Sequence, residues 1–448
     1  MFSRLSNRRR KPTFRMVNSC SIAPATRILW KADYRMLKSD KKTIVEILGR
    51  SPIRPFPARM APGIALDALG EGKIPLRVLD PMAGSGTVLA VARANGHRAF
   101  GMDLDPLAVL LAGVWTRTVD AEQVNSKARQ VFDRAKAAFG LLSSGRAYPA
   151  GSDDETRKFI RFWFDDYARR QMTALSASIR RVHDDAIRDV LWCGLSRLII
   201  TKRGGASLAM DLSHSRPHRE FTRAPVKPFD RFLPAVGVVV SNCPQTGSGA
   251  IGPAAVVTRG DARKLNMGDG SIDLVVTSPP YLNAINYMRC SKFSLVWLGY
   301  NLDEVRRIRA ESVGTEASSE EASGADWVAS LTKGLGLKPE LSKRDHALLA
   351  RYVWDMEKAL GEVSRVLRTG GRAVYVVGDS TVRGTFIRNS SIIAALAEKR
   401  GLSLLSRHSR ALPANRRYLP PPKRGGSTTR MDSRMRREVV LLFRKCAA

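Results

Sequence analysis

The segment Thr277-Ser278-Pro279-Pro280-Tyr281 combines hydroxyl groups, two prolines and an aromatic ring directly after an apolar run that predicts a buried strand. Adjacent prolines have no backbone N–H and a restricted φ, so their carbonyls remain available as acceptors. Such a site suits an amine. The Ser278 hydroxyl and the Pro279 carbonyl can accept from an exocyclic amino group, while Tyr281 stacks on the base that carries it, a contact worth about 1–3 kcal/mol. The plainer alternative is a turn in which Tyr281 only fills the core.

A second segment that could bind a ligand lies about two hundred residues upstream, at residues 78–92. It predicts a strand, a tight turn through Gly84 and Gly86, and a helix whose first N–H groups are free to bind a ligand. The next strand, predicted over residues 98–102, ends at Asp103, where an acid is placed to hold a pair of ribose hydroxyls. The pattern therefore favours a nucleoside-type cofactor over a mere turn.

Together these residues resemble the S-adenosylmethionine-dependent amino-methyltransferases of DNA. Residues 80–87, Asp-Pro-Met-Ala-Gly-Ser-Gly-Thr, are similar to the family's cofactor loop, and residues 277–281 are similar to its catalytic loop in the Ser form. Residues 260–262 resemble the loop that holds the adenine, and residues 55–60 resemble the element that closes over the methionine end.

The resemblance implies S-adenosylmethionine as the cofactor and DNA as the partner. It assigns cofactor binding to Phe56, Pro57, Asp80, Ala83, Gly84, Ser85, Gly86, Thr87, Asp103 and Asp261, and catalysis to Ser278, Pro279, Pro280 and Tyr281.

The resemblance implies methylation of N4 of cytosine, because position 278 is Ser rather than Asp. Three alternatives stay open: an adenine-N6 DNA methyltransferase, an RNA base methyltransferase, and a nucleic-acid-binding protein that transfers nothing. Two departures from the family pattern are Met82, where Phe is usual, and the cofactor loop, which precedes the catalytic loop here although many cytosine-N4 enzymes have the reverse order. A role in restriction would require a separate nuclease.

The composition agrees with a nucleic-acid partner. The 448 residues include 74 Lys and Arg against 41 Asp and Glu, a formal net charge of +33, which attracts polyanions. The five cysteines show no zinc-like spacing, so we expect no metal and a reducing compartment such as the cytoplasm. No apolar run approaches the roughly 20 residues of a membrane span.

The chain is expected to contain a basic, disordered leader at residues 1–45, a cofactor-binding half at 46–119, a mostly helical insertion at 120–250, and a catalytic half at 251–448 with a loop at 300–345. Apolar residues recur at three- and four-residue steps over 165–200, which predicts helices. Alternating strands and helices elsewhere predict an α/β fold, a doubly wound Rossmann-like methyltransferase sheet of about seven strands. In the last part we expect helices at 359–367 and 391–398, a glycine turn at 370–371, and strands at 372–377, 402–406 and 438–443.

Two basic segments are candidates for DNA contact, of which the first could instead be a solvated connector and the second could clamp phosphates. The first, residues 201–228, belongs to the helical insertion and could recognise the target sequence in DNA. The second lies between the last two strands. Their predicted phosphate contacts are Lys202, Arg203, Arg216, Arg219, Arg416, Arg417, Lys423 and Arg424. Polar residues 283–289 are expected to line the pocket beside Tyr281. The aromatic run 162–164 could stack on bases, although three such residues beside a helix are more typical of a core.

Overall fold

The structure is a computed structural model. It describes residues 38–39, 41–56, 59–70, 74–201, 204–210, 218–246, 252–282, 288–315, 330–331, 333, 342–382, 385–412 and 437–447.

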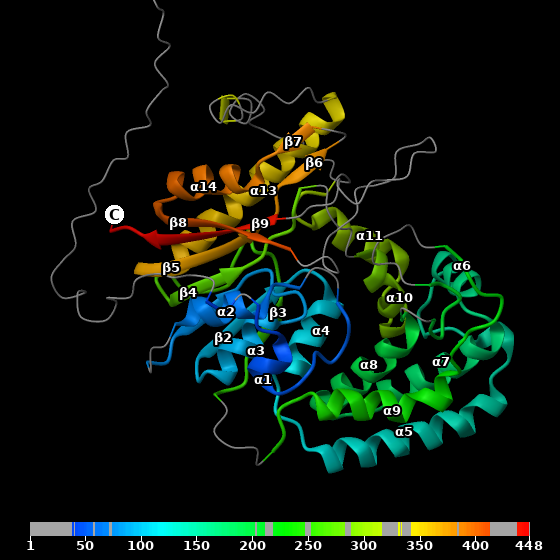
Figure 1. Ribbon diagram of the computed structural model, residues 1–448. Coiled ribbons are helices and arrows are strands. Elements are labelled where there is room, and N and C mark those ends of the chain that lie inside the picture. The colour runs from blue at the N-terminus through cyan, green and yellow to red at the C-terminus, as the bar shows by residue number, and fades with distance from the viewer. Residues whose placement is uncertain are drawn as a thin grey trace, which may run out of the picture.

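A seven-stranded sheet with the order β3-β2-β1-β4-β5-β9-β8 forms the centre of the fold (Figure 1). The first five strands in that order are parallel, and β9 is antiparallel to both of its neighbours. The strands are β1 (Arg77–Asp80), β2 (Arg98–Asp103), β3 (Val256–Arg259), β4 (Ile272–Thr277), β5 (Leu367–Val377), β8 (Leu402–Ala411) and β9 (Arg437–Lys445). This confirms the predicted doubly wound Rossmann-like sheet of about seven strands.

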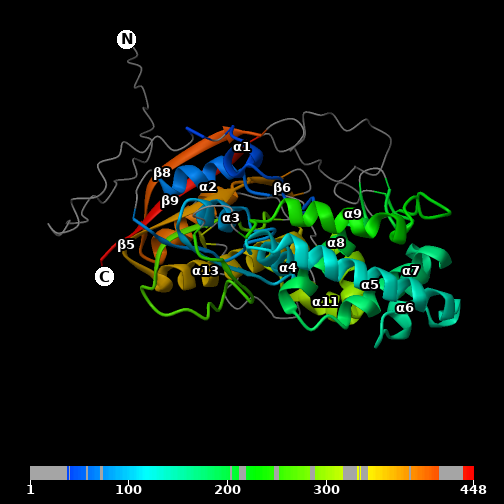
Figure 2. The same ribbon diagram turned by 90° about the horizontal axis from the view of Figure 1, so that it is seen from below.

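Helices cover both faces of the sheet, which explains why consecutive residues of its central strands, such as 78–80 and 274–277, are buried. Val78 and Val276 point to the face covered by α1 (Ile44–Leu48), α2 (Pro62–Leu69) and α3 (Thr87–Ala94). Leu79 and Val275 point to the face covered by α13 (Lys343–Val366) and α14 (Asn389–Lys399). The same arrangement is seen in Figure 2. A small hairpin, β6 (Ser380–Val382) and β7 (Thr385–Ile387), stands apart from this sheet.

A group of helices lies beside the sheet and shares one apolar core with α4 (Pro106–Trp115). It comprises α5 (Ala121–Leu141), α6 (Asp154–Trp163), α7 (Asp166–Arg180), α8 (Asp185–Ile199) and α9 (Pro228–Ser241), with the short 3-10 helix η2 (Ser144–Arg146) between α5 and α6. Helices α10 (Met288–Leu298) and α11 (Leu302–Glu311) connect this group to the sheet (Figure 1). In α5 to α8 an aspartate side chain accepts a free backbone N–H of the first turn, which explains where each helix begins; these caps are Asp120, Asp153, Asp165 and Asp184.

Three local predictions were wrong. The predicted disordered leader at 1–45 extends too far, because α1 begins at Ile44 after a capping box of Thr43 and Glu46. Residues 302–311 of the predicted loop form α11, because Val305 and Ile308 bury one face and Asn301 and Glu304 form a capping box. The predicted glycine turn at 370–371 lies inside β5, where Gly370 has a φ of 74° and the β4–β5 register shifts. Glycine there permits an irregular strand rather than a chain reversal. In the part of the chain that the structure describes, no helix is long and apolar enough to cross a membrane.

Candidate cofactor and substrate site

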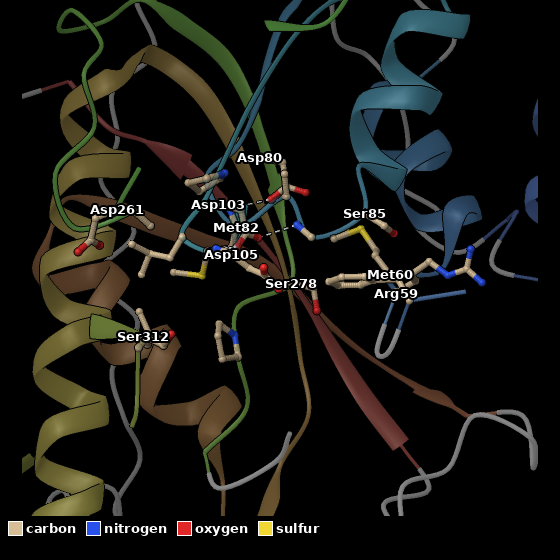
Figure 3. A pocket seen from close by; sticks show the side chains of 18 of the residues that line it. Arg59, Met60, Asp80, Met82, Ser85, Asp103, Asp105, Asp261, Ser278 and Ser312 are labelled. Atoms are coloured by element: carbon tan, nitrogen blue, oxygen red, sulfur yellow. Dashed lines mark hydrogen bonds between the residues drawn. The ribbon is translucent and has the colours of Figure 1, made fainter. Parts of the chain in front are cut away.

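One cavity of about 300 Å³ opens at the carboxyl ends of the parallel strands, where open α/β sheets bind their ligands. Residues from both predicted motifs line it: Phe56, Asp80, Ala83, Gly84, Ser85, Thr87, Asp103, Asp261, Ser278, Pro280 and Tyr281. Figure 3 shows Asp261 and Ser312 at one end of the cavity, Ser85 and Arg59 at the other, and Ser278 between them. The fold therefore brings together two loops that lie about two hundred residues apart in the sequence.

The turn after β1 depends on two glycines with positive φ, 49° at Gly84 and 84° at Gly86. The Gly84 N–H donates to Asp103 Oδ2 over 2.8 Å. Gly86 does not line the cavity. A Cβ at this position would lie 2.8 Å from the Cβ and 2.9 Å from the Cα of Ala112 on α4. Gly86 therefore lies where the start of α3 packs closely against α4, behind the loop that was predicted to contact the cofactor.

Asp103 ends β2 with its carboxylate in the cavity, held by backbone N–H groups on both oxygens. Besides Gly84, the N–H of Asp105 donates to Oδ1 over 2.9 Å. Burial raises the pKa of Asp103 to about 6, and the charge of Asp105 adds to the shift. A carboxylate offers about four acceptor positions, so two N–H groups leave room for ribose hydroxyls.

Asp80 joins the two loops. The Thr277 hydroxyl donates to its Oδ1 over 2.8 Å, and the Met82 N–H donates to the same oxygen over 3.2 Å. Burial raises the pKa of Asp80 to about 7, with a further contribution from the charge of Asp103. Asp80 therefore holds the cofactor loop against the end of β4, in addition to lining the cavity.

The hydroxyl groups of Ser278 and Tyr281 both donate to acceptors on neighbouring strands of the sheet. The Ser278 hydroxyl donates to the Val376 carbonyl over 3.1 Å, which leaves its oxygen lone pairs as acceptors. The Tyr281 hydroxyl donates to Glu438 Oε2 over 3.5 Å, and Glu438 forms a buried ion pair with Arg410. Pro279 is not among the lining residues, whereas Pro280 is.

Asp261 lies at the far end of the cavity and is already paired. Its carboxylate accepts from the Arg263 guanidinium over 2.7 and 3.0 Å, and Arg263 also binds Asp355 over 2.6 Å. Asp355 in turn accepts the Gly314 N–H over 3.1 Å. This network joins the β3 loop to the segment that follows α11.

Sequence reasoning missed the part of the wall formed after α10 begins. Arg309 and residues 312–315 line the cavity, and all of them lie in the segment 300–345 that was predicted as a loop. Their position follows from the packing of α11, for which the sequence signals were the apolar pair Val305 and Ile308 and the capping box of Asn301 and Glu304. Of the segment 283–289, which was predicted to line the pocket, Met288 and Arg289 line the cavity, and residues 283–287 lie outside the described residues. Arg59 and Met60 also line the cavity. They lie in the predicted element at 55–60, but neither was predicted to bind the cofactor.

The residues present fit the cofactor that the family resemblance implies. Ser85 Oγ is buried, lines the cavity and has no hydrogen-bond partner within the described part of the chain, so it can bind a polar group of the ligand. Met82 fills apolar space in the wall, as Phe would. The acids Asp103 and Asp261 add acceptors for hydroxyl and amino groups. An elongated ligand with a nucleoside and a polar tail matches this set of groups.

The predicted DNA contacts are mostly outside the described residues, and so is Pro57 of the cofactor motif. The contacts outside are Lys202, Arg203, Arg216, Arg416, Arg417, Lys423 and Arg424. Arg219 is described, is exposed, and lies 5.9 Å from the ring of Phe162. Phe162 is 52% exposed, whereas Trp163 and Phe164 are buried in the core of the helical group. The aromatic run is therefore divided between core and surface, as its position at the end of α6 requires.

Comparison with known proteins gives one match along most of the chain, and no family model matches. The type II methyltransferase M.MvaI of Kocuria varians is 23% identical over 417 residues, spanning 87% of this chain and 89% of that protein. Because the match spans so much of both chains, it extends well beyond the two motif regions.

Solved structures give weaker matches. A candidate DNA modification methylase from Thermus thermophilus, complexed with S-adenosyl-L-methionine, has 20% identity and a TM-score of 0.21, covering 42% of this chain and about half, 52%, of that one. A SAM-dependent methyltransferase from Methanosarcina mazei has 10% identity and a TM-score of 0.29, covering 84% and 94%. At these TM-scores the fold assignment rests on the strand order of the chain itself.

Proposed function

We propose that this chain, a member of the S-adenosylmethionine-dependent DNA methyltransferases, methylates an exocyclic amino group of a base in DNA, with N4 of cytosine as the favoured acceptor. S-adenosylmethionine is the cofactor. The observation that supports the proposal best is the single cavity shared by the glycine loop, Asp103 and the Ser278–Tyr281 loop. The net charge of +33 supports a polyanionic partner.

Asp80, Ser85, Asp103 and Asp261 line the part of the cavity that we call the cofactor wall, and this wall would bind the cofactor by hydrogen bonds. Asp103 accepts from the ribose hydroxyls, Asp261 accepts from the adenine amino group, and Ser85 binds at the methionine end. The bound cofactor supplies a methyl group on a sulfonium, which is electrophilic enough to need no covalent enzyme intermediate. The protein's contribution is then position and electrostatics.

Ser278 and Tyr281 line the part of the cavity that we call the base wall. This wall would receive a base that has left the DNA stack, at a cost of a few kcal/mol. Stacking on Tyr281 offsets part of this cost. The Ser278 oxygen can accept from the amino group, because its own proton is donated to Val376. The Pro279 carbonyl, predicted as a second acceptor, is outside the lining of the cavity, so Ser278 is the acceptor that would orient the nitrogen lone pair toward the methyl group. As the N–C bond forms and the S–C bond breaks, the surplus amino proton leaves to solvent.

The choice of cytosine N4 over adenine N6 rests on the family resemblance at position 278. A neutral serine accepts from either amine, so the preference carries less support than the reaction itself.

The test is to incubate the protein with methyl-labelled S-adenosylmethionine and either duplex DNA or RNA, and to identify the modified nucleoside by mass spectrometry. We expect N4-methylcytosine from DNA. N6-methyladenine would correct the base, and label only in RNA would correct the substrate. No label in either would overturn the proposed activity, provided that calorimetry shows the protein to bind S-adenosylmethionine.

A further inference from the structure

Three cations with no described acidic partner lie together where α10 and α11 border the cavity. Arg289 and Lys292 stand one turn apart on α10, and Arg309 is in the last turn of α11. Arg289 and Arg309 are exposed and line the cavity, so they lie at its opening. Within the described ranges no carboxylate forms an ion pair with any of the three.

Lys292 packs against two aromatic rings. Its Nζ lies 5.2 Å from the centre of the Phe159 ring and 5.7 Å from that of Phe293, which belongs to the buried core. Burial, together with the charges of Arg289 and Arg309, lowers the pKa of Lys292. The three positive charges therefore repel one another, and an anion placed among them would relieve that repulsion.

Neighbouring arginines on α11 show that pairing is available at this surface. Arg306 forms an ion pair with Glu155 over 2.5 Å, and Arg307 forms one with Asp303 over 3.1 Å. Arg309, on the same helix, has no such partner in the described part of the chain. The charge of Arg309 at the cavity is thus available to a ligand, whereas the charges of Arg306 and Arg307 are neutralised by their ion-pair partners.

The cavity itself is acidic. Asp80, Asp103, Asp105 and Asp261 line it, and a polyanion brought to its opening would meet an unfavourable field without compensating cations. A nucleotide that enters with its base toward Ser278 keeps its phosphates at the opening. Cations at this position would offset the repulsion where the phosphates have to remain.

We propose that Arg289, Lys292 and Arg309 form a phosphate-binding cluster, which holds the DNA backbone beside the nucleotide being methylated. This inference rests on the proposed function and adds to it the element that anchors the strand. Arginine and lysine contacts of this kind contribute to affinity for every sequence and give binding its salt dependence.

The test compares two double variants with the same loss of charge. Arg289→Gln/Arg309→Gln removes two cluster cations, and Arg306→Gln/Arg307→Gln removes two paired cations from the same surface. The dissociation constant for a fluorescent mixed-sequence DNA duplex is measured by anisotropy over a series of KCl concentrations. Each lost phosphate contact lowers the slope of log affinity against log salt by about 0.9. We expect a decrease of about two for the cluster variant, with affinity at 0.1 M salt weakened on the order of tenfold or more, and little change for the control.

A third variant, Lys292→Met, keeps an unbranched stem against Phe159 and Phe293 and should lower the slope by about one. Calorimetry with S-adenosylmethionine checks that each variant is folded. Equal slopes for the cluster and control variants would overturn the cluster, as would a loss seen with RNA but not with DNA. These slopes do not depend on turnover, so failure of the methylation assay with wild-type protein would contradict the proposed function separately.

Discussion

The two walls of the cavity are built on opposite principles. On the cofactor wall, Asp80 is buried and Asp103 is half-buried, and both carboxylates are held by backbone N–H groups or a buried hydroxyl. On the base wall, Ser278 and Tyr281 are neutral and depend on side-chain or carbonyl partners behind them. Beyond this wall, the exposed cations Arg289 and Arg309 border the opening.

This difference matches the charges of the two ligands we propose. A sulfonium cofactor is favoured by carboxylates, and it can be bound by a wall that is complete before the ligand arrives. A DNA strand is a polyanion whose base has to enter from outside, so its wall needs an open, cationic border. The cofactor wall should therefore be sensitive to changes in packing and proton binding, and the base wall to loss of single side chains.

The largest effect is expected from Gly86→Ala, which tests whether the cofactor wall depends on close packing. The new Cβ would meet Ala112 at 2.8 Å, at a residue whose φ is 84°. We expect a loss of about 2–5 kcal/mol of the free energy of unfolding. Chemical denaturation measures it. Gly96→Ala is the matched control, because Gly96 has a φ of 79° with nothing within 4 Å, and should cost only about 1–2 kcal/mol. Equal losses would show that the contact with α4 is unimportant.

Tyr281→Ala tests whether the base wall depends on single side chains. Losing a stacking contact of about 1–3 kcal/mol should lower turnover on DNA by about 5-fold to 150-fold. The affinity for S-adenosylmethionine, measured by calorimetry, should stay near that of the wild type. Tyr281→Phe keeps the ring, removes the hydroxyl that donates to Glu438, and should retain most activity. Undiminished methylation by the alanine variant would refute the proposed stacking.

Asp103→Ala should weaken binding of S-adenosylmethionine by about 2 kcal/mol, or about 30-fold, because it removes a charged acceptor. Calorimetry gives the dissociation constant. Asp269→Ala is the control for the change of charge, since Asp269 pairs with Arg365 and lies outside the lining residues. A dissociation constant that does not change on Asp103→Ala would remove this residue from the site.

The smallest effect expected is a pH dependence of cofactor affinity. With pKa values of about 6 for Asp103 and about 7 for Asp80, both carboxyls are largely protonated at pH 5. Ionised carboxylates are the better acceptors and attract the sulfonium, so affinity should rise about tenfold from pH 5 to pH 7. Calorimetry at several pH values measures this, and Asp103→Ala should show a smaller rise.

Stability of the free protein should respond to pH in the opposite sense. The pKa values of Asp80 and Asp103 are higher in the folded than in the unfolded chain. The protonated carboxyls therefore contribute fully to the free energy of unfolding below about pH 4, and this contribution is lost as the pH rises through 6 and 7. An affinity that does not vary with pH, with stability falling as expected, would mean that the cofactor does not contact these carboxyls.

Much of the fold could be predicted because its central strands carry local signals. The apolar run at 274–277 and the glycine turn at 84–86 lie where a strand and a strand-to-helix turn were expected. The helix α11 was missed because its acidic, Ser-rich surroundings at 311–326 dominate the composition, while only two buried residues mark its inner face. Gly370 was misread because positive φ serves an irregular strand as well as a turn.

The sequence by itself determined the chemistry of the two motifs and the α/β fold that presents them, since strands, glycine turns and helices follow from short-range patterns. Only the tertiary structure decided that Asp80 accepts from Thr277, that Ser278 donates to Val376, and that Arg309 comes to the opening of the cavity. These contacts join residues that are distant in the chain. They depend on the order of strands in the sheet and on how α10 and α11 pack, which no local pattern specifies.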